Sequence, residues 1–244
     1  MTLMRRITAI FTILLLSSSF IWGLTLRERE SPLNYFKKER KQDYKFALSE
    51  AREILSELKA QDYPYAMEAA SIVFPELMRY RSFQNEIESL FNEVLAVTTE
   101  ESDGFSIGEF QMKPVFAIQV EKIISLNPQL RQKYGAVSFG GDVSTVQARR
   151  DRVMRLNDKT LQLEYLKAFI DYEVEVLSLA SEDLNSRISY LSAAYNFGIS
   201  QDRKYLERAF NMETFPSGKR RLYFNYQKIC LDAAVELGRE VKKK

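Results

Sequence analysis

Residues 41–59, KQDYKFALSEAREILSELK, give the clearest indication of the fold class. Apolar residues recur in this stretch at the spacing of one helix face: Phe46, Ala47, Ala51, Ile54, Leu55 and Leu58. The same period continues through most of the chain after residue 24, and the alternating runs typical of strands are nearly absent. The sequence therefore predicts a mainly α fold, whose first clear helix ends before Asp62.

A second helix is expected directly after this one, and a carboxylate lies at its end. Pro64 suits the first turn of a helix, with Asp62 as a candidate cap. The helix is expected to run to Phe74, just before Pro75. Glu76 should therefore lie at or near a helix end, among apolar neighbours. Desolvation raises the pKa of a carboxyl group, as a proton donor at neutral pH requires.

Residues 106–114, SIGEFQMKP, form a second segment with features of a binding site. Gly108 permits a tight backbone, and the amide of Gln111 offers both a donor and an acceptor to a ligand. A helix is expected to follow Pro114 and to stop before Asn127-Pro128.

A third segment, Ala193–Gly198, ends another expected helix, which Ser181 would cap. The hydroxyl of Tyr195 can orient a carboxyl group without competing for its charge, and Gly198 is placed to take a left-handed terminating conformation. Further helices are expected over residues 82–94, 146–179 with a break near 157–158, and 219–237. Gly135–Val143, with three glycines, is the clearest flexible segment.

Composition excludes several classes of mechanism. The chain has no histidine, so Ser-His and Cys-His nucleophile pairs and histidine metal sites are excluded. Cys230 is the single cysteine, so no intramolecular disulfide can form. The net charge of +2, with lysine and arginine scattered, argues against nucleic acid as a partner. Carboxylates remain in quantity, and they are the groups that cleave glycosidic bonds without an imidazole.

The N-terminus has the pattern of an export signal. Arg5 and Arg6 precede an uncharged apolar run over residues 7–24. Cleavage near Gly23 is one alternative, and an uncleaved signal anchor in the membrane is the other. Either one predicts export to the periplasm or cell envelope. We therefore divide the chain into a signal segment (1–23), a helical extension (24–61) and one domain (62–244).

Taken together, Phe74-Pro75-Glu76, Gly108–Pro114 and Ala193–Gly198 resemble the lysozyme-like lytic transglycosylases. In that family a catalytic glutamate ends a helix, a G-L-M-Q-x-x-P segment follows, and an A-Y-N-x-G helix end comes later. The resemblance implies a lysozyme-like helical domain with helical N- and C-terminal extensions. It also implies that peptidoglycan glycan strands are the partner.

The resemblance further implies the role of each residue. Glu76 would be the single acid and base that cleaves the bond between MurNAc and GlcNAc and leaves a 1,6-anhydro end, with no metal or cofactor. Residues expected to bind substrate are Gln111, Phe110, Met112, Tyr195 and Asn196. Residues expected to shape the backbone are Gly108, Pro114 and Gly198.

The chain also departs from the family pattern, and these departures leave alternatives open. Leu77 stands where the family has serine, and Glu109-Phe110 stands where it has Leu-Met. A hydrolase would need a second carboxylate, for which Asp103 and Glu109 are the candidates. An inactive envelope protein that binds glycan or a protein partner is another alternative. A helical scaffold in which the three segments are coincidental is the last.

Overall fold

The structure, a computed structural model, describes residues 31–82, 106–139, 145–215 and 224–241, and most of them lie in helices. The first part forms α2 (Pro32–Glu39), α3 (Lys41–Ala60), α4 (Ala66–Ile72) and α5 (Phe74–Ser82). The middle forms α7 (Pro114–Leu126), α8 (Pro128–Lys133), the 3-10 helix η2 (Gly135–Val137), α9 (Val146–Asn157) and α10 (Lys159–Val176). The last part forms α11 (Leu184–Phe197), α12 (Arg203–Ala209), β1 (Glu213–Phe215), β2 (Phe224–Asn225) and α13 (Tyr226–Val241). The prediction of a mainly α fold is confirmed.

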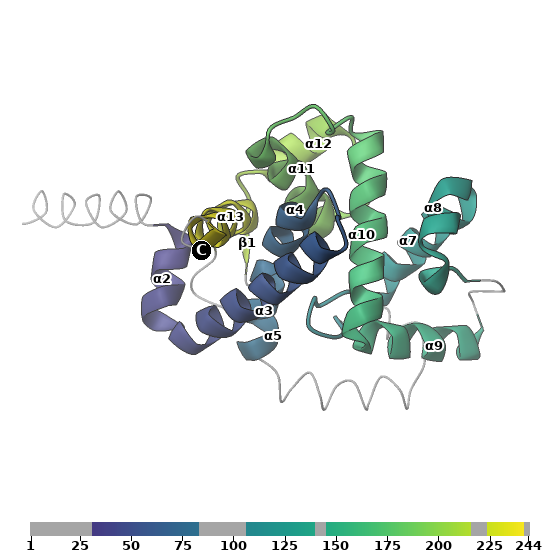
Figure 1. The fold of residues 1–244 in the computed structure, drawn as a ribbon, viewed down its shortest axis with the longest axis horizontal. Helices are drawn as coiled ribbons and strands as arrows, with labels where there is room; N and C mark the ends of the chain where they lie inside the picture. The colour runs from purple at the N-terminus through teal and green to yellow at the C-terminus, as the bar shows by residue number, and fades with distance from the viewer. Residues whose placement is uncertain (1–30, 83–105, 140–144, 216–223, 242–244) are drawn as a thin grey trace, which may run out of the picture.

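The long helix α10 stands between two groups of helices (Figure 1). Helices α7, α8 and α9 lie on one side of it, and α2 to α5 with α11 to α13 lie on the other. Helix α10 packs against α7 and α9 on the first side and against α4 and α11 on the second. It therefore joins the two groups through one continuous hydrophobic core.

The stripe on α3 is buried almost as the sequence predicts. Ala47, Ala51, Ile54, Leu55 and Leu58 all lie in the core, where α3 packs against α4 and α5. Phe46 is the exception. It is only half-buried and contacts the ring of Tyr80, while Tyr44 takes the buried place.

The chain turns at Val73, where the sequence predicted one uninterrupted helix up to Phe74. Helix α4 ends at Ile72, and α5 begins at Phe74. Pro75 is accepted in the first turn of α5 because the N–H that it lacks has no helical partner there. Glu76 therefore lies in the first turn of a new helix.

One other predicted helix boundary is confirmed, and two predicted capping residues are wrong. The break near residue 158 is confirmed, and Asp158 caps α10 by accepting from the N–H of Leu161 (3.0 Å). Asp183, rather than Ser181, caps α11, because its carboxylate reaches the N–H of Ser186 (3.0 Å). Asp62 caps no helix and has a positive φ of 53°.

Two short strands were not predicted. Strands β1 and β2 pair antiparallel just before the last helix, so α13 begins at Tyr226 rather than near residue 219.

Helix α7 begins at Pro114 and ends before Asn127, as predicted. The signal segment, residues 83–94 of the expected helix 82–94 and residues 140–143 of the glycine-rich segment fall outside the described residues. The described part of the glycine-rich segment, predicted to be flexible, begins with the 3-10 helix η2. Within the part of the chain that the structure describes, no helix has the length and apolarity needed to cross a membrane.

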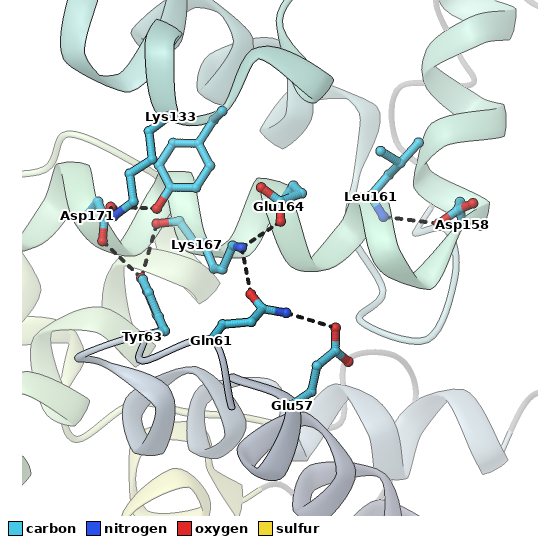
Figure 2. A network of polar contacts seen from close by, with 10 residues as sticks. Glu57, Gln61, Tyr63, Lys133, Asp158, Leu161, Glu164, Lys167 and Asp171 are labelled. Carbon is cyan, nitrogen blue, oxygen red and sulfur yellow. Dashed lines mark hydrogen bonds and ion pairs between the residues drawn. The ribbon is translucent and has the colours of Figure 1, made fainter. Parts of the chain in front are cut away.

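Polar contacts reinforce the junction between the two groups of helices (Figure 2). The carboxylate of Asp171 on α10 accepts hydrogen bonds from Tyr63, in the loop before α4 (3.0 Å), and from Tyr134, after α8 (2.5 Å). Lys133 forms an ion pair with the same carboxylate. One side chain of α10 therefore connects the segments on either side of it.

Candidate active site

One cleft collects residues from all three of the segments that the sequence singled out. Its volume is about 380 Å³, which lies within the range of small-molecule sites. Six predicted site residues line it: Glu76, Gln111, Met112, Tyr195, Asn196 and Gly198. The first turn of α5, the start of α7 and the end of α11 therefore meet at one place, although they lie far apart in the sequence.

Glu76 is buried at the wall of this cleft and is 7% exposed. Burial raises the pKa of its carboxyl group above the usual value. The positive charge of Arg79, the Tyr226 hydroxyl and the charge of Lys113 oppose this shift without cancelling it. Because the pKa of Glu76 is raised, its carboxyl group holds a proton at a higher pH than an exposed glutamate does.

The middle segment is a tight turn closed by two backbone hydrogen bonds between Ile107 and Met112 (2.8 and 3.1 Å). Gly108 and Gln111 both take positive φ in this turn, 68° and 51°. The amide nitrogen of Gln111 donates to the carbonyl of Gly108 (2.8 Å), which holds the side chain at the cleft wall. Gln162 of α10 fixes the turn further by donating to the carbonyl of Ile107 (2.8 Å).

Only glycine fits at position 108. A Cβ atom there would lie 2.4 Å from the carbonyl oxygen of Leu156 and 2.3 Å from Nε2 of Gln162, on a backbone that L side chains rarely adopt. The backbone carbonyl cannot move aside without disturbing α9. Gly108 therefore has the structural role that the sequence predicted.

We expect Gly108→Ala to lower the free energy of unfolding by about 2 kcal/mol or more, since the steric clash adds to the strain of a positive φ. Gly238→Ala is the matched control. Position 238 is a helical glycine with open space around its Cβ position, so this change should raise stability by up to about 1 kcal/mol. Urea denaturation measures both. An equal effect of the two substitutions would contradict the described geometry.

Tyr195 connects the end of α11 to the middle segment. Its hydroxyl donates to the backbone carbonyl of Phe110 (2.8 Å), and its ring packs edge-on against Phe116 and Phe169. Burial, and then the charge of Glu76, raise the pKa of Tyr195 well above its usual value. The hydroxyl therefore stays protonated and acts as a neutral donor.

Asn196 and Gly198 complete this wall. The amide of Asn196 donates to the hydroxyl of Thr214 on β1 (2.9 Å), and its side chain is exposed to the cleft. Gly198 ends α11 with a φ of 120° and a ψ of 153°. The positive φ was predicted. The ψ lies outside the left-handed helical region that the prediction specified.

Two site predictions from the middle segment are corrected by the structure. Phe110 is fully buried in the core, so its side chain cannot bind substrate, and only its carbonyl serves the site. Glu109 forms an ion pair with Lys159 of α10 (3.3 Å) and is not among the residues that line the cleft. The tight turn directs these two neighbours away from the cleft. Asp103 lies outside the described residues.

Several cleft residues were not predicted from the sequence, and three of them act on Glu76: Arg79, Lys113 and Tyr226. Arg79 lies one helical turn after Glu76, and this i, i+3 spacing could have revealed it. Tyr226 falls within the helix predicted over residues 219–237, and nothing in the sequence marked it as a site residue. In the structure it is buried, donates to the carbonyl of Ile72 (3.0 Å) and lines the cleft. Lys113 gave no signal beyond its place next to Pro114.

Within the described residues, no group of three or more His, Cys, Asp or Glu side chains is arranged to hold a metal ion. Comparisons of the chain with protein-family models, with curated proteins and with solved structures found no match. The function is therefore inferred from the residues and geometry of the cleft.

Proposed function

We propose that this chain is an exported, lysozyme-like lytic transglycosylase that cleaves peptidoglycan in the periplasm or cell envelope. One observation is its main support. A buried glutamate with a raised pKa shares one cleft with Gln111, Met112, Tyr195 and Asn196, and these residues come from the three segments that resemble that family.

In the proposed reaction Glu76 acts twice. Its carboxyl group first protonates the glycosidic oxygen as the bond from that oxygen to C1 of MurNAc breaks, and the leaving sugar departs as an alcohol. The carboxylate then takes the proton of the C6 hydroxyl of the same MurNAc, whose oxygen bonds to C1. The product carries a 1,6-anhydro ring, Glu76 is again protonated, and no water is consumed.

The composition of the cleft favours this route over hydrolysis. Among the described residues that line the cleft, Glu76 is the one carboxylate. A hydrolase needs a second carboxylate as nucleophile or base, at a defined separation from the acid. Glu109, one of the two candidates, lies in an ion pair outside the lining.

The remaining lining residues suit an N-acetylated sugar. The amides of Gln111 and Asn196 offer donors and acceptors to the hydroxyl and acetamido groups of the glycan. Met112 and Phe215 add apolar surface for the sugar faces. We assign substrate positioning to these four side chains.

A second candidate function is glycan binding without catalysis, and the contact between Arg79 and Glu76 favours it. Oε2 of Glu76 lies 3.4 Å from Nη1 of Arg79. A neighbouring cation stabilises the carboxylate form, which cannot donate a proton. The two functions therefore differ in whether Glu76 is protonated when glycan is bound.

Incubation of the purified protein with peptidoglycan tests the proposal. We expect soluble fragments with anhydro ends, identified by mass spectrometry. If the protein sediments with insoluble peptidoglycan but releases no fragments from it, the chain binds glycan without cleaving it. Reducing ends in place of anhydro ends would indicate a hydrolase.

A further inference from the structure

In the part of the cleft lining that the structure describes, two cationic side chains lie beside one carboxylate. Arg79 belongs to α5, and Lys113 lies just before α7, so the two reach the cleft from different elements. Among the described lining residues, these two cations face one carboxylate, Glu76, and the cleft is net positive. The excess of positive charge is larger whenever Glu76 is protonated, as the first step of the proposed reaction requires.

The contact between Arg79 and Glu76 is weak enough to be exchanged. It joins one guanidinium nitrogen to one carboxylate oxygen at 3.4 Å, beyond the usual length of a charge-assisted hydrogen bond. The side chain of Arg79 is 28% exposed, whereas that of Glu76 is 9% exposed. An incoming carboxylate can therefore reach Arg79 from the open side and bind its guanidinium in the two-pronged geometry that arginine favours.

We propose that Arg79, together with Lys113, binds a carboxylate on the glycan, and that this exchange frees Glu76 to hold the proton it donates. The inference rests on the proposed function, because it names the substrate class of the same site as an acidic glycan. It also explains how Glu76 can act as an acid although it forms an ion pair with Arg79 when no substrate is bound. Until an acidic substrate binds, Arg79 favours the carboxylate form of Glu76, which cannot donate a proton.

The surroundings of Glu76 support this direction of change. The groups that act on it are Arg79 of α5, Lys113 before α7, Tyr195 of α11, and Tyr226 and Cys230 of α13. The charge of Arg79 is the largest of the causes that lower the pKa of Glu76. When Arg79 binds a substrate carboxylate instead, its charge lowers the pKa of Glu76 less. The effect of burial then dominates more strongly, so the pKa of Glu76 rises further.

The carboxylate has two sources in peptidoglycan. Where the stem peptide is absent, the lactyl group of MurNAc ends in a free carboxylate. Where the stem is present, that group is an amide and the carboxylates belong to the peptide. Three substrates separate these cases: glycan with intact stems, glycan stripped of stems, and the stripped glycan with its carboxylates converted to neutral methyl amides.

The experiment measures kcat/KM on the three substrates for the full chain and for Arg79→Gln, Lys113→Gln and Lys122→Gln. We expect the full chain to prefer an acidic glycan over the neutral one by about tenfold or more, the value of a charge-assisted contact. Arg79→Gln should lose the preference, and Lys113→Gln should reduce it. Lys122→Gln removes an exposed cation on α7 that is not a lining residue, so it should keep the full preference.

A second readout separates this role from a merely structural one. On the neutral glycan, Arg79→Gln should move the alkaline limb of the kcat/KM profile to higher pH, because a general acid is active while protonated. Arg79→Lys retains a positive charge and should restore part of the preference. This variant also guards against a loss of folding in Arg79→Gln.

Equal kcat/KM of the full chain on acidic and neutral glycan would overturn the inference and leave the proposed function standing. An undiminished preference in Arg79→Gln would do the same. If the full chain cleaves none of the three, the proposed function fails, and sedimentation with stripped glycan then tests the inference alone. Weaker binding by Arg79→Gln than by Lys122→Gln would support the carboxylate site, and equal binding would refute it.

Discussion

Glu76→Gln should abolish glycan cleavage while the protein keeps its fold and its affinity for peptidoglycan. Glutamine has nearly the same shape and can fill the same buried place, but it cannot donate a proton to the glycosidic oxygen or take one from the C6 hydroxyl. Because one residue serves as both acid and base, both steps fail together. We expect kcat to fall by about a thousandfold or more, near the upper end of what general acid catalysis contributes.

Glu175→Gln is the matched control for this variant. Glu175 is exposed on α10 and does not line the cleft, so the same chemical change there should leave kcat unaltered. Sedimentation of each protein with insoluble peptidoglycan measures the affinity. A Glu76→Gln protein that retains a tenth of the activity or more would exclude Glu76 as the acid.

Glu173→Gln should remove a large pH dependence from the stability of the fold. Glu173 on α10 is fully buried, and one of its oxygens accepts from the backbone N–H of Ser200 (2.7 Å). The other oxygen, Oε2, has no hydrogen-bond partner among the described residues. Burial raises the pKa of Glu173 from 4.5 to about 7.

The sign of this effect follows from the raised pKa. The protonated form is favoured in the folded state, so the stabilising contribution is complete below pH 4.5 and is lost as the pH rises through about 7. Relative to Glu173→Gln, the unmodified protein should lose about 3 kcal/mol of unfolding free energy between pH 4 and pH 8. Urea denaturation at several pH values measures the difference, with Glu175→Gln as the control. A constant difference across this range would show that Glu173 titrates normally.

Glu173 also has a place in the architecture of the site. Ser200, which it holds, follows the end of α11 that presents Tyr195 and Asn196 to the cleft. A buried carboxyl group on the central helix thus anchors the loop behind one wall of the site.

Much of the fold could be predicted from helical periodicity. The stripe on α3 and the break at Asp158 are local features, since apolar spacing and a capping side chain identify them. The turn at Val73 could not be predicted in this way. Pro75 is compatible both with the end of one helix and with the first turn of the next, and packing of α5 on α3 selects the second.

The candidate site could likewise be predicted only in part from the sequence. Gln111 and Tyr195 could be assigned to one site because their segments resemble a family pattern, and both line the cleft. The directions of Glu109 and Phe110 could not be predicted, because in a turn with two positive φ values the side chains follow no simple period. Tyr226 belongs to an ordinary apolar stripe, and only the tertiary fold brings it beside Glu76.

Product analysis in heavy-oxygen water tests whether a hydroxyl of the sugar itself or a water molecule attacks C1. Peptidoglycan is incubated with the protein in this solvent, and the new glycan ends are weighed by mass spectrometry. We predict 1,6-anhydro ends without heavy oxygen, because the C6 hydroxyl of the sugar, and not water, attacks C1. Reducing ends that contain heavy oxygen would contradict it, since they require water as the nucleophile.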